Sequence, residues 1–229
     1  MKTKYGSKRQ KLLSSALVAG LLGTSISSGA IIQSVAGPIN GSDGGAGTVI
    51  VDTSNDTGDW ITNLNAGQTT FIRFDWTISN NNGESGTGGF YGGMGVFGAG
   101  ELLLVGNGWE SLNYGAGAGP TIENSATAYT VGETVSLLVQ LSQNTGGLDT
   151  WKVWVNPDGS SLESAPDIER TDWNLDGISQ FTSRAGGSPG AATISNLTVA
   201  SSFSDVVPEP SSSVMLLTGL AGMALRRRR

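Results

Sequence analysis

The 229-residue chain contains no cysteine and no histidine, and each absence excludes a class of chemistry. Without cysteine there are no disulfide bonds, no thiolate nucleophile and no thiolate metal ligands. Without histidine there is no imidazole metal ligand and no histidine-based catalytic triad. Hydrolytic chemistry in this chain would therefore have to rest on carboxylates.

Basic residues are also scarce in the middle of the chain. Nine of the 13 lysines and arginines lie within residues 1–11 or at positions 226–229. Residues 43–205 carry four cations against eighteen acidic residues, a net charge of −14. Because such a body repels phosphate backbones, we expect no nucleic acid partner. The four cations are Arg73, Lys152, Arg170 and Arg184.

The N-terminal segment has the pattern of a secretory signal peptide. Its basic start is followed by an uncharged, largely apolar run over residues 12–26 and then by small residues. We predict a signal peptide over residues 1–36, with a signal helix and cleavage after Ala30 or after Ala36, and hence export through the inner membrane. The alternative is a retained N-terminal membrane anchor.

The C-terminal segment has three parts in a fixed order. Pro208, Glu209 and Pro210 precede three serines, an apolar run over residues 214–225, and a terminal arginine cluster. The two prolines predict that the folded domain ends at residue 205. Twelve apolar residues form a helix of about 18 Å, shorter than a bilayer core of about 30 Å, which suits a temporary transmembrane anchor.

This three-part order resembles the PEP-CTERM sorting tail, with residues 206–229 as the tail. The resemblance implies that Pro208, Glu209 and Pro210 are the recognition motif. It further implies a membrane-embedded processing enzyme of the exosortase type as partner, and then a location at the cell surface or outside the cell. The stop-transfer charge would be supplied by Arg226, Arg227, Arg228 and Arg229. A plain tail anchor is the alternative.

The body between these ends is predicted to be all-β. Apolar and polar side chains alternate over residues 72–78, 135–141 and 151–155, and the glycines of residues 143–148 suit a hairpin turn. No stretch has a helical period, so we predict one antiparallel β-sandwich domain over residues 37–205. Further strands are expected at residues 90–97, 101–105, 178–182 and 192–199.

The order of these segments is similar to that of concanavalin A-like and laminin-G-like jelly rolls. The similarity covers residues 48–200 and implies a domain of a kind that binds glycans or matrix proteins, or in some members cleaves glycans. Fold alone does not choose between these activities.

No pair of carboxylates stands two residues apart on a predicted strand, which is one way to build a glycosidase site. The closest acid pairs are Asp167 with Glu169 and Asp172 with Asp176, in a segment predicted to be a loop. We therefore expect that the chain is not an enzyme.

Residues 172–177 match the first half of a calcium-binding loop. Asp172, Asn174 and Asp176 provide alternate oxygens before Gly177, but position twelve is Ser183 and not a bidentate glutamate. The segment is either a calcium site or an ordinary turn. No other cofactor is expected.

Several aromatic residues stand in polar, glycine-rich surroundings. Trp109, Tyr114 and Trp173 are candidates for stacking on sugar rings, since an exposed aromatic ring offers a flat apolar face. The alternative is that each packs at the edge of the core.

Three functional hypotheses follow. The first is an exported surface or matrix protein with a structural or adhesive role near exopolysaccharide, as in a biofilm. The second is a lectin-like module with one specific sugar site. The third is a glycoside-cleaving enzyme.

Overall fold

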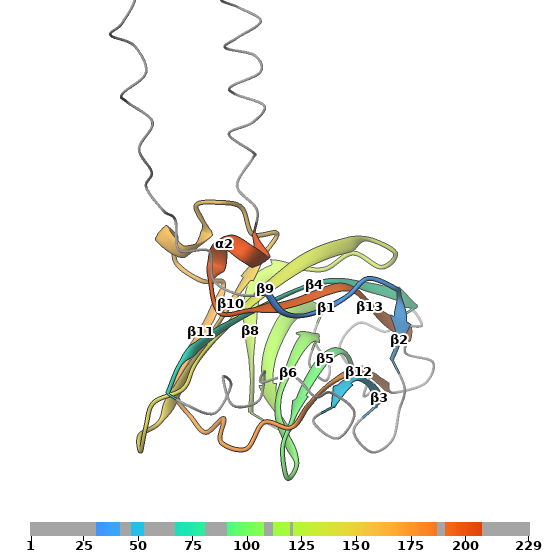
Figure 1. Cartoon of the computed structure of the whole chain (residues 1–229). Helices are drawn as coiled ribbons and strands as arrows, with labels where there is room; N and C mark the ends of the chain where they lie inside the picture. Colours follow the sequence, from blue (N-terminus) through green and yellow to red (C-terminus); the bar gives the residue numbers. More distant parts are fainter. Residues whose placement is uncertain are drawn as a thin grey trace, which may run out of the picture.

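The computed structural model describes residues 31–41, 47–52, 67–80, 91–107, 112–119, 121–186 and 191–207. Within them the chain forms two antiparallel β-sheets packed face to face (Figure 1). The predicted all-β sandwich is therefore confirmed. The predicted signal helix and C-terminal hydrophobic helix lie outside the described residues.

The first sheet, sheet A, has the strand order β1-β13-β4-β9-β10-β11, with β2 beside β13. Its strands are β1 (Ile31–Val35), β2 (Ile39–Asn40), β4 (Thr69–Asn80), β9 (Thr134–Ser142), β10 (Asp149–Val155), β11 (Ile168–Trp173) and β13 (Ala191–Ala200). The second, sheet B, has the order β3-β12-β5-β6-β7-β8. Its strands are β3 (Thr48–Asp52), β5 (Tyr91–Phe97), β6 (Glu101–Asn107), β7 (Asn113–Ala118), β8 (Thr121–Ala128) and β12 (Gln180–Gly186). The helical elements are η1 (Ser161–Glu163) and α2 (Phe203–Val206).

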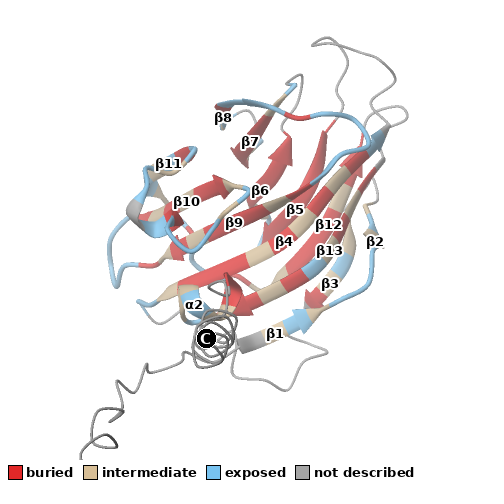
Figure 2. Cartoon of the chain, turned by 90° about the horizontal axis from the view of Figure 1, so that it is seen from above, coloured by how far each residue is buried: buried red, intermediate tan, exposed pale blue. Residues whose placement is uncertain are grey.

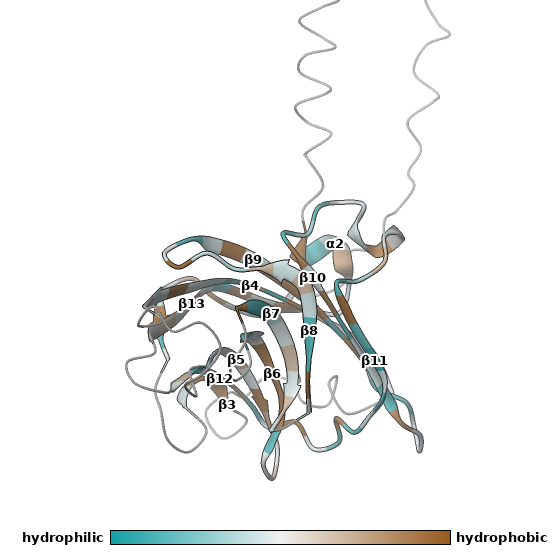
Figure 3. Cartoon of the chain, turned by 180° about the vertical axis from the view of Figure 1, so that it is seen from behind, coloured by the Kyte–Doolittle hydropathy of each residue, from teal (hydrophilic) through white to brown (hydrophobic). Residues whose placement is uncertain are grey.

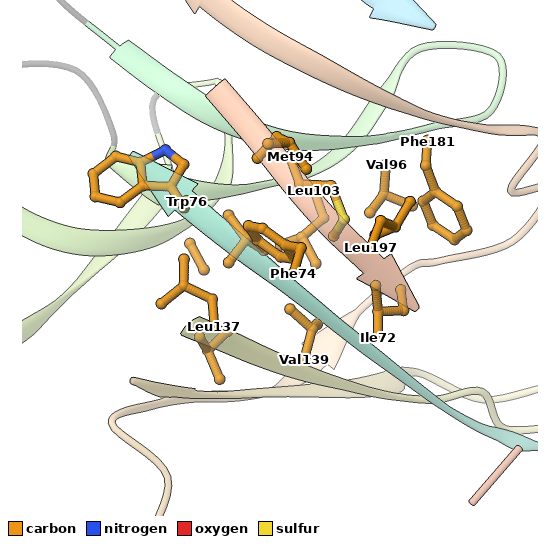
Figure 4. Packing of buried hydrophobic residues seen from close by; sticks show 14 of the residues in the cluster. Ile72, Phe74, Trp76, Met94, Val96, Leu103, Leu137, Val139, Phe181 and Leu197 are labelled. Atoms are coloured by element: carbon orange, nitrogen blue, oxygen red, sulfur yellow. The ribbon is translucent and has the colours of Figure 1, made fainter. Parts of the chain in front are cut away.

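The main core lies between the two sheets. Period-two alternation turns Ile72, Phe74 and Trp76 of β4 inward, and all three are buried. Figure 4 shows these side chains meeting residues from β9 and from the opposite sheet, including Met94 and Phe181. Burial of this many large apolar side chains is the main stabilising term of the fold.

Most of the predicted strands are confirmed within a few residues, including the hairpin that joins β9 to β10. Besides β1, β2 and β3 near the N-terminus, three further strands were not expected. Strand β11 occupies the segment that we predicted to be a loop, and β7 and β8 lack a clear apolar period. The sequences NYGAGA and TIENSATA contain few large apolar residues, so tertiary pairing and not patterning forms these strands.

The folded part also extends beyond the predicted domain boundaries at both ends. Strand β1 pairs with β13 although it lies within the segment assigned to the signal peptide. At the other end, Val206 and Val207 are buried against the outer face of sheet A, where Figure 2 shows α2 lying across the strands. The folded body therefore includes residues on both sides of the predicted range.

Within the described ranges, no helix has both the length and the apolar character needed to cross a membrane. The apolar runs at residues 12–26 and 214–225 lie outside those ranges.

Candidate functional site

The outer face of sheet B carries a mostly buried arginine, Arg184, that the sequence analysis did not single out. Along β12, Phe181 points into the core. Because side chains alternate along a strand, Thr182 and Arg184 lie on the opposite, outer face of sheet B. An added Cβ at Gly95 would meet Phe97, Thr182 and Arg184 together, which places these side chains on one face. We call Arg184 and its neighbours Tyr91, Phe97, Glu101 and Thr182 the Arg184 cluster.

The guanidinium of Arg184 makes contacts on several sides. Its Nη1 donates to the carboxylate of Glu101, and its Nη2 donates to the hydroxyl of Tyr91 at 3.1 Å. Its Cζ lies 5.0 Å from the ring centroid of Tyr91 and 5.5 Å from that of Phe97. The two charged side chains are only 15% and 19% exposed. A pair shielded from water in this way interacts more strongly than a surface pair.

Two polar atoms of this cluster have no hydrogen-bond partner among the described residues. They are Arg184 Nε and Thr182 Oγ1, and both are buried. Buried donors without partners are uncommon because each forfeits its hydrogen bonds to water. The cluster therefore holds unused hydrogen-bonding capacity beside a charged pair.

A row of glycines runs across sheet B beside Arg184. Arg184 pairs with Gly93, which pairs with Gly106, which pairs with Gly115. Gly106 has φ of +157°, and a Cβ there would collide with the carbonyl oxygen of Gly92. The glycines thus allow closely approaching, strongly bent strands. They also leave this row without side chains.

Trp173, one of the predicted stacking residues, links the two sheets. Its indole N–H donates to the carbonyl oxygen of Leu102 at 2.8 Å, and its ring meets Trp151 edge to face at 6.0 Å. The guanidinium of Arg170 lies over the Trp173 ring at 4.7 Å. Because Arg170 already covers one face of this ring, these contacts favour a packing role at the edge of the core.

Tyr114 is only 4% exposed, and its ring meets Trp76 and Tyr129 edge to face at 5.6 and 6.2 Å. Burial, with a smaller contribution from the charge of Glu133, raises the pKa of Tyr114 to about 12. A ring enclosed in this way offers no face to a sugar, so the stacking prediction for Tyr114 is corrected. Trp109 lies outside the described residues.

The candidate calcium residues are occupied by other partners. Arg170 donates through Nε and Nη2 to the two carboxylate oxygens of Asp172, at 2.8 and 3.0 Å. This hydrogen bond is the main cause that lowers the pKa of Asp172. The side-chain oxygen of Asn174 accepts the backbone N–H of Asp176 at 2.8 Å, the pattern of an Asx turn. These contacts favour the ordinary-turn interpretation.

No cluster of three or more acidic side chains that could hold a metal ion occurs in the described part of the chain. Arg170 also reaches across to Glu123 of β8 at 3.1 Å. Figure 3 shows β8 and β11 side by side with hydrophilic residues along both, at the edge where the two sheets meet. The Arg170 contacts therefore tie the two sheets together at this edge.

Solved structures similar to the chain are carbohydrate-active proteins. An endo-β-1,4-glucuronan lyase from Trichoderma reesei is 13% identical, with 65% of this chain and 76% of that chain covered and a TM-score of 0.47. A Trypanosoma rangeli sialidase is 15% identical, with coverages of 73% and 25% and a TM-score of 0.46. The alginate lyase Aly36B is 15% identical, with coverages of 58% and 69% and a TM-score of 0.38. A search of the curated proteins gave no match.

These matches contradict the expectation that the chain is not an enzyme. The similar structures named above are enzymes. At 13–15% identity the likeness concerns the fold alone and assigns no reaction or substrate to this chain.

The C-terminal tail gives the more specific match. Residues 206–229 match the family described as the PEP-CTERM protein-sorting motif, which confirms the prediction from Pro208, Glu209 and Pro210. Those three residues and Arg226–229 lie outside the described residues, and the body ends in the buried Val207 directly before them. The match indicates that the chain is exported, anchored transiently in the membrane and sorted by an exosortase-type enzyme.

Proposed function

We propose that the exported body binds a neutral polysaccharide through the Arg184 cluster, and so serves an adhesive or structural role near exopolysaccharide. One observation carries the proposal: Arg184 Nε and Thr182 Oγ1 lack partners beside the mostly buried Arg184–Glu101 pair. The sorting tail supports the location, because it indicates export.

The chemistry of the cluster suits sugar hydroxyls. A hydroxyl group both donates and accepts hydrogen bonds, and the pair offers guanidinium donors next to carboxylate acceptors. The rings of Tyr91 and Phe97 are only 3% and 7% exposed, so they flank the guanidinium and hold it in place rather than offer a face to the ligand. The neighbouring glycines have no side chains, so a ligand there can lie directly against the backbone of the sheet.

The charge distribution favours a neutral ligand over a polyanion. The positive charge of Arg184 is balanced by Glu101, so the cluster has no net charge to attract a uronate. Residues 43–205 carry a net charge of −14, which repels anionic chains at low salt.

The test is a binding titration of the processed protein with a neutral glucan and with alginate, followed by tryptophan fluorescence and calorimetry. We expect saturable binding to the neutral glucan, weakened about tenfold or more by Arg184→Gln, since one hydrogen bond to a charged group supplies about 1.5 kcal/mol or more. Lys152→Gln is the matched control, because Lys152 pairs with Glu169 on sheet A at 3.1 Å.

The variant Thr182→Val tests the effect on binding without a loss of stability. It removes a buried hydroxyl that has no partner, so we expect unchanged or slightly higher stability together with weaker binding. Absence of saturable binding, or equal affinity for wild type, Arg184→Gln and Thr182→Val, would contradict the proposal. Stronger binding to alginate than to the glucan would contradict its neutral-ligand part.

A further inference from the structure

A buried carboxylate lies at the base of the β9–β10 hairpin. Asp149 is only 1% exposed, and its two oxygens accept the backbone N–H groups of Asn144 at 2.8 Å and of Leu175 at 2.7 Å. Within the described ranges, no lysine or arginine forms an ion pair with Asp149. A buried charge is costly unless a partner of opposite charge or hydrogen bonds compensate it. Two backbone N–H groups thus provide the compensation that the described residues give to this carboxylate.

A buried amide lies opposite this carboxylate. Ser142 pairs with Thr150, so Gln143 and Asp149 are the next residues on the two strands of the hairpin. Gln143 is only 6% exposed, and its Nε2 donates to the carbonyl oxygen of Leu175 at 3.0 Å. Its Oε1 is buried and has no hydrogen-bond partner among the residues that the structure describes. The base of the hairpin therefore combines a carboxylate with an unused amide oxygen.

The two side chains end in the same small region of the molecule. Gln143 binds the carbonyl oxygen of Leu175 and Asp149 binds its N–H group, so both polar ends lie beside one residue. Trp151 is two positions beyond Asp149 on β10, and side chains at that spacing share one face of a strand. Trp151 is fully buried. An aromatic reporter therefore stands next to the carboxylate.

We propose that Asp149 and Gln143 bind a calcium ion at the base of this hairpin. Calcium takes oxygen ligands in a flexible arrangement, and carboxylates and side-chain amide oxygens are among its usual ligands. Each oxygen of Asp149 accepts one N–H group and keeps further lone-pair capacity for an ion. Residues 144–148 are exposed, so water supplies the remaining ligands from that side.

This site differs from the calcium loop that the sequence predicts at residues 172–177. It rests on a carboxylate that no arginine occupies, whereas both oxygens of Asp172 bind Arg170. With one carboxylate the affinity is low, with a Kd of about 1 mM, which suits an exported protein. The ion would fasten the β9–β10 turn to the β11–β12 connection, where Leu175 lies. The inference does not rest on the saccharide site.

The first test is terbium luminescence of the exported protein with excitation of tryptophan. Terbium replaces calcium at oxygen sites, and Trp151 is close enough to Asp149 to transfer energy to the ion. We expect a saturable signal that calcium chloride displaces and that Asp149→Asn lowers at least about fivefold. Asp176→Asn is the matched control, because it removes an exposed carboxylate from the neighbouring turn.

Three outcomes of this titration would overturn the inference. They are the absence of a saturable signal, a signal that calcium chloride does not displace, and equal signals from Asp149→Asn and wild type. Loss of the signal in Asp176→Asn alone would place the ion in the loop of residues 172–177 and would also overturn it. Loss of saccharide binding in the same protein counts only against the proposed function.

The second test is urea unfolding with about 10 mM calcium chloride and with a chelator. A ligand that binds only the folded state raises its stability, so the midpoint of wild type should be higher in calcium. Asp149→Asn also removes an acceptor from a backbone N–H group and lowers stability by itself. The quantity to compare is therefore the rise that calcium causes, which this variant should lose and Asp176→Asn should keep.

Gln143→Glu provides a gain of function at the same site. It places a second carboxylate beside Asp149 and removes the hydrogen bond to Leu175, so we expect lower stability in chelator. Calcium should bind this variant about tenfold more tightly than wild type, because affinity rises with the number of charged ligands. Equal midpoints of wild type in calcium and chelator, or a calcium affinity of Gln143→Glu no higher than that of wild type, would overturn the inference.

Discussion

The contribution of a charged side chain to the stability of this body depends on how far it is shielded from water. Lys152 and Glu169 form an exposed pair on sheet A, which contributes at most about 1 kcal/mol to stability. Arg184 and Glu101 form a mostly buried pair, and removal of one partner there leaves an uncompensated charge. The ion pair on sheet A therefore contributes little to stability, whereas the ion pair on sheet B is costly to break.

Tyr114 gives a prediction for the pH dependence of stability. Because burial raises its pKa to about 12, the unfolded chain loses this proton near pH 10 while the folded chain retains it. The folded state then binds more protons than the unfolded state, so the free energy of unfolding falls as pH rises from 10 to 12. This group contributes about 2–3 kcal/mol of that loss.

Urea unfolding at pH 9, 10, 11 and 12 measures the effect. Tyr114→Phe keeps the ring contacts with Trp76 and Tyr129 but has no titrating hydroxyl. Its stability should therefore fall less steeply over this range than that of wild type. Equal slopes for the two proteins would show that Tyr114 is not the cause.

At the scale of elements, the pairing of strand β1 favours signal cleavage after Ala30 over cleavage after Ala36. Residues 31–35 pair with β13, and Val35 packs against the main core. The carbonyl oxygen of Ala36 also accepts the N–H of Asn196 at 3.4 Å. Cleavage after Ala36 would remove this strand and with it the packing of the partly buried Val35, at a cost of about 1 kcal/mol for that side chain alone.

We therefore expect signal cleavage after Ala30 and a mature N-terminus at Ile31, read by N-terminal sequencing of the exported protein. Ala30→Leu should block this cleavage, because the position before the cut needs a small side chain. Ala36→Leu is the matched control and should be processed normally. A mature protein that begins at Gly37 would contradict this assignment.

The strands that sequence patterning predicts are those whose burial follows the period of a strand. In β4, Ile72, Phe74 and Trp76 face the core, and alternation alone locates them. Patterning does not predict strands β7 and β11, because β7 consists mostly of glycine and alanine and β11 is a polar edge strand. Their positions depend on pairing with β6 and β10, the strands that precede them in the chain.

The candidate site could be predicted less well than the fold. Arg184 is one cation among four in the body, and nothing in its local sequence distinguishes it. Its partner Glu101 is 83 residues away, and the glycine row arises only from the register of three strands. The tail is the opposite case, since its order of motif, apolar run and arginines is read directly from the chain.

For the molecule as a whole, the first and the last described residues of the chain lie at one end of the sandwich. Ile31 of β1 pairs with Ala200 of β13, and α2 begins three residues later (Figure 1). An exported chain attached at this end presents the opposite end of the body away from the membrane. Cutting the tail would then free the whole body in one step.

Sorting of the whole chain should therefore depend on the motif directly after the body. The double variant Pro208→Ala with Glu209→Ala removes the charge and the proline that define the motif, while the apolar run and the arginines remain. We expect it to stay uncleaved in the inner membrane, as measured by fractionation and intact mass. Ser211→Ala with Ser212→Ala is the matched control and should be released like wild type. If the motif variant reached the surface with the mass of the processed wild-type protein, the tail would not act through this motif.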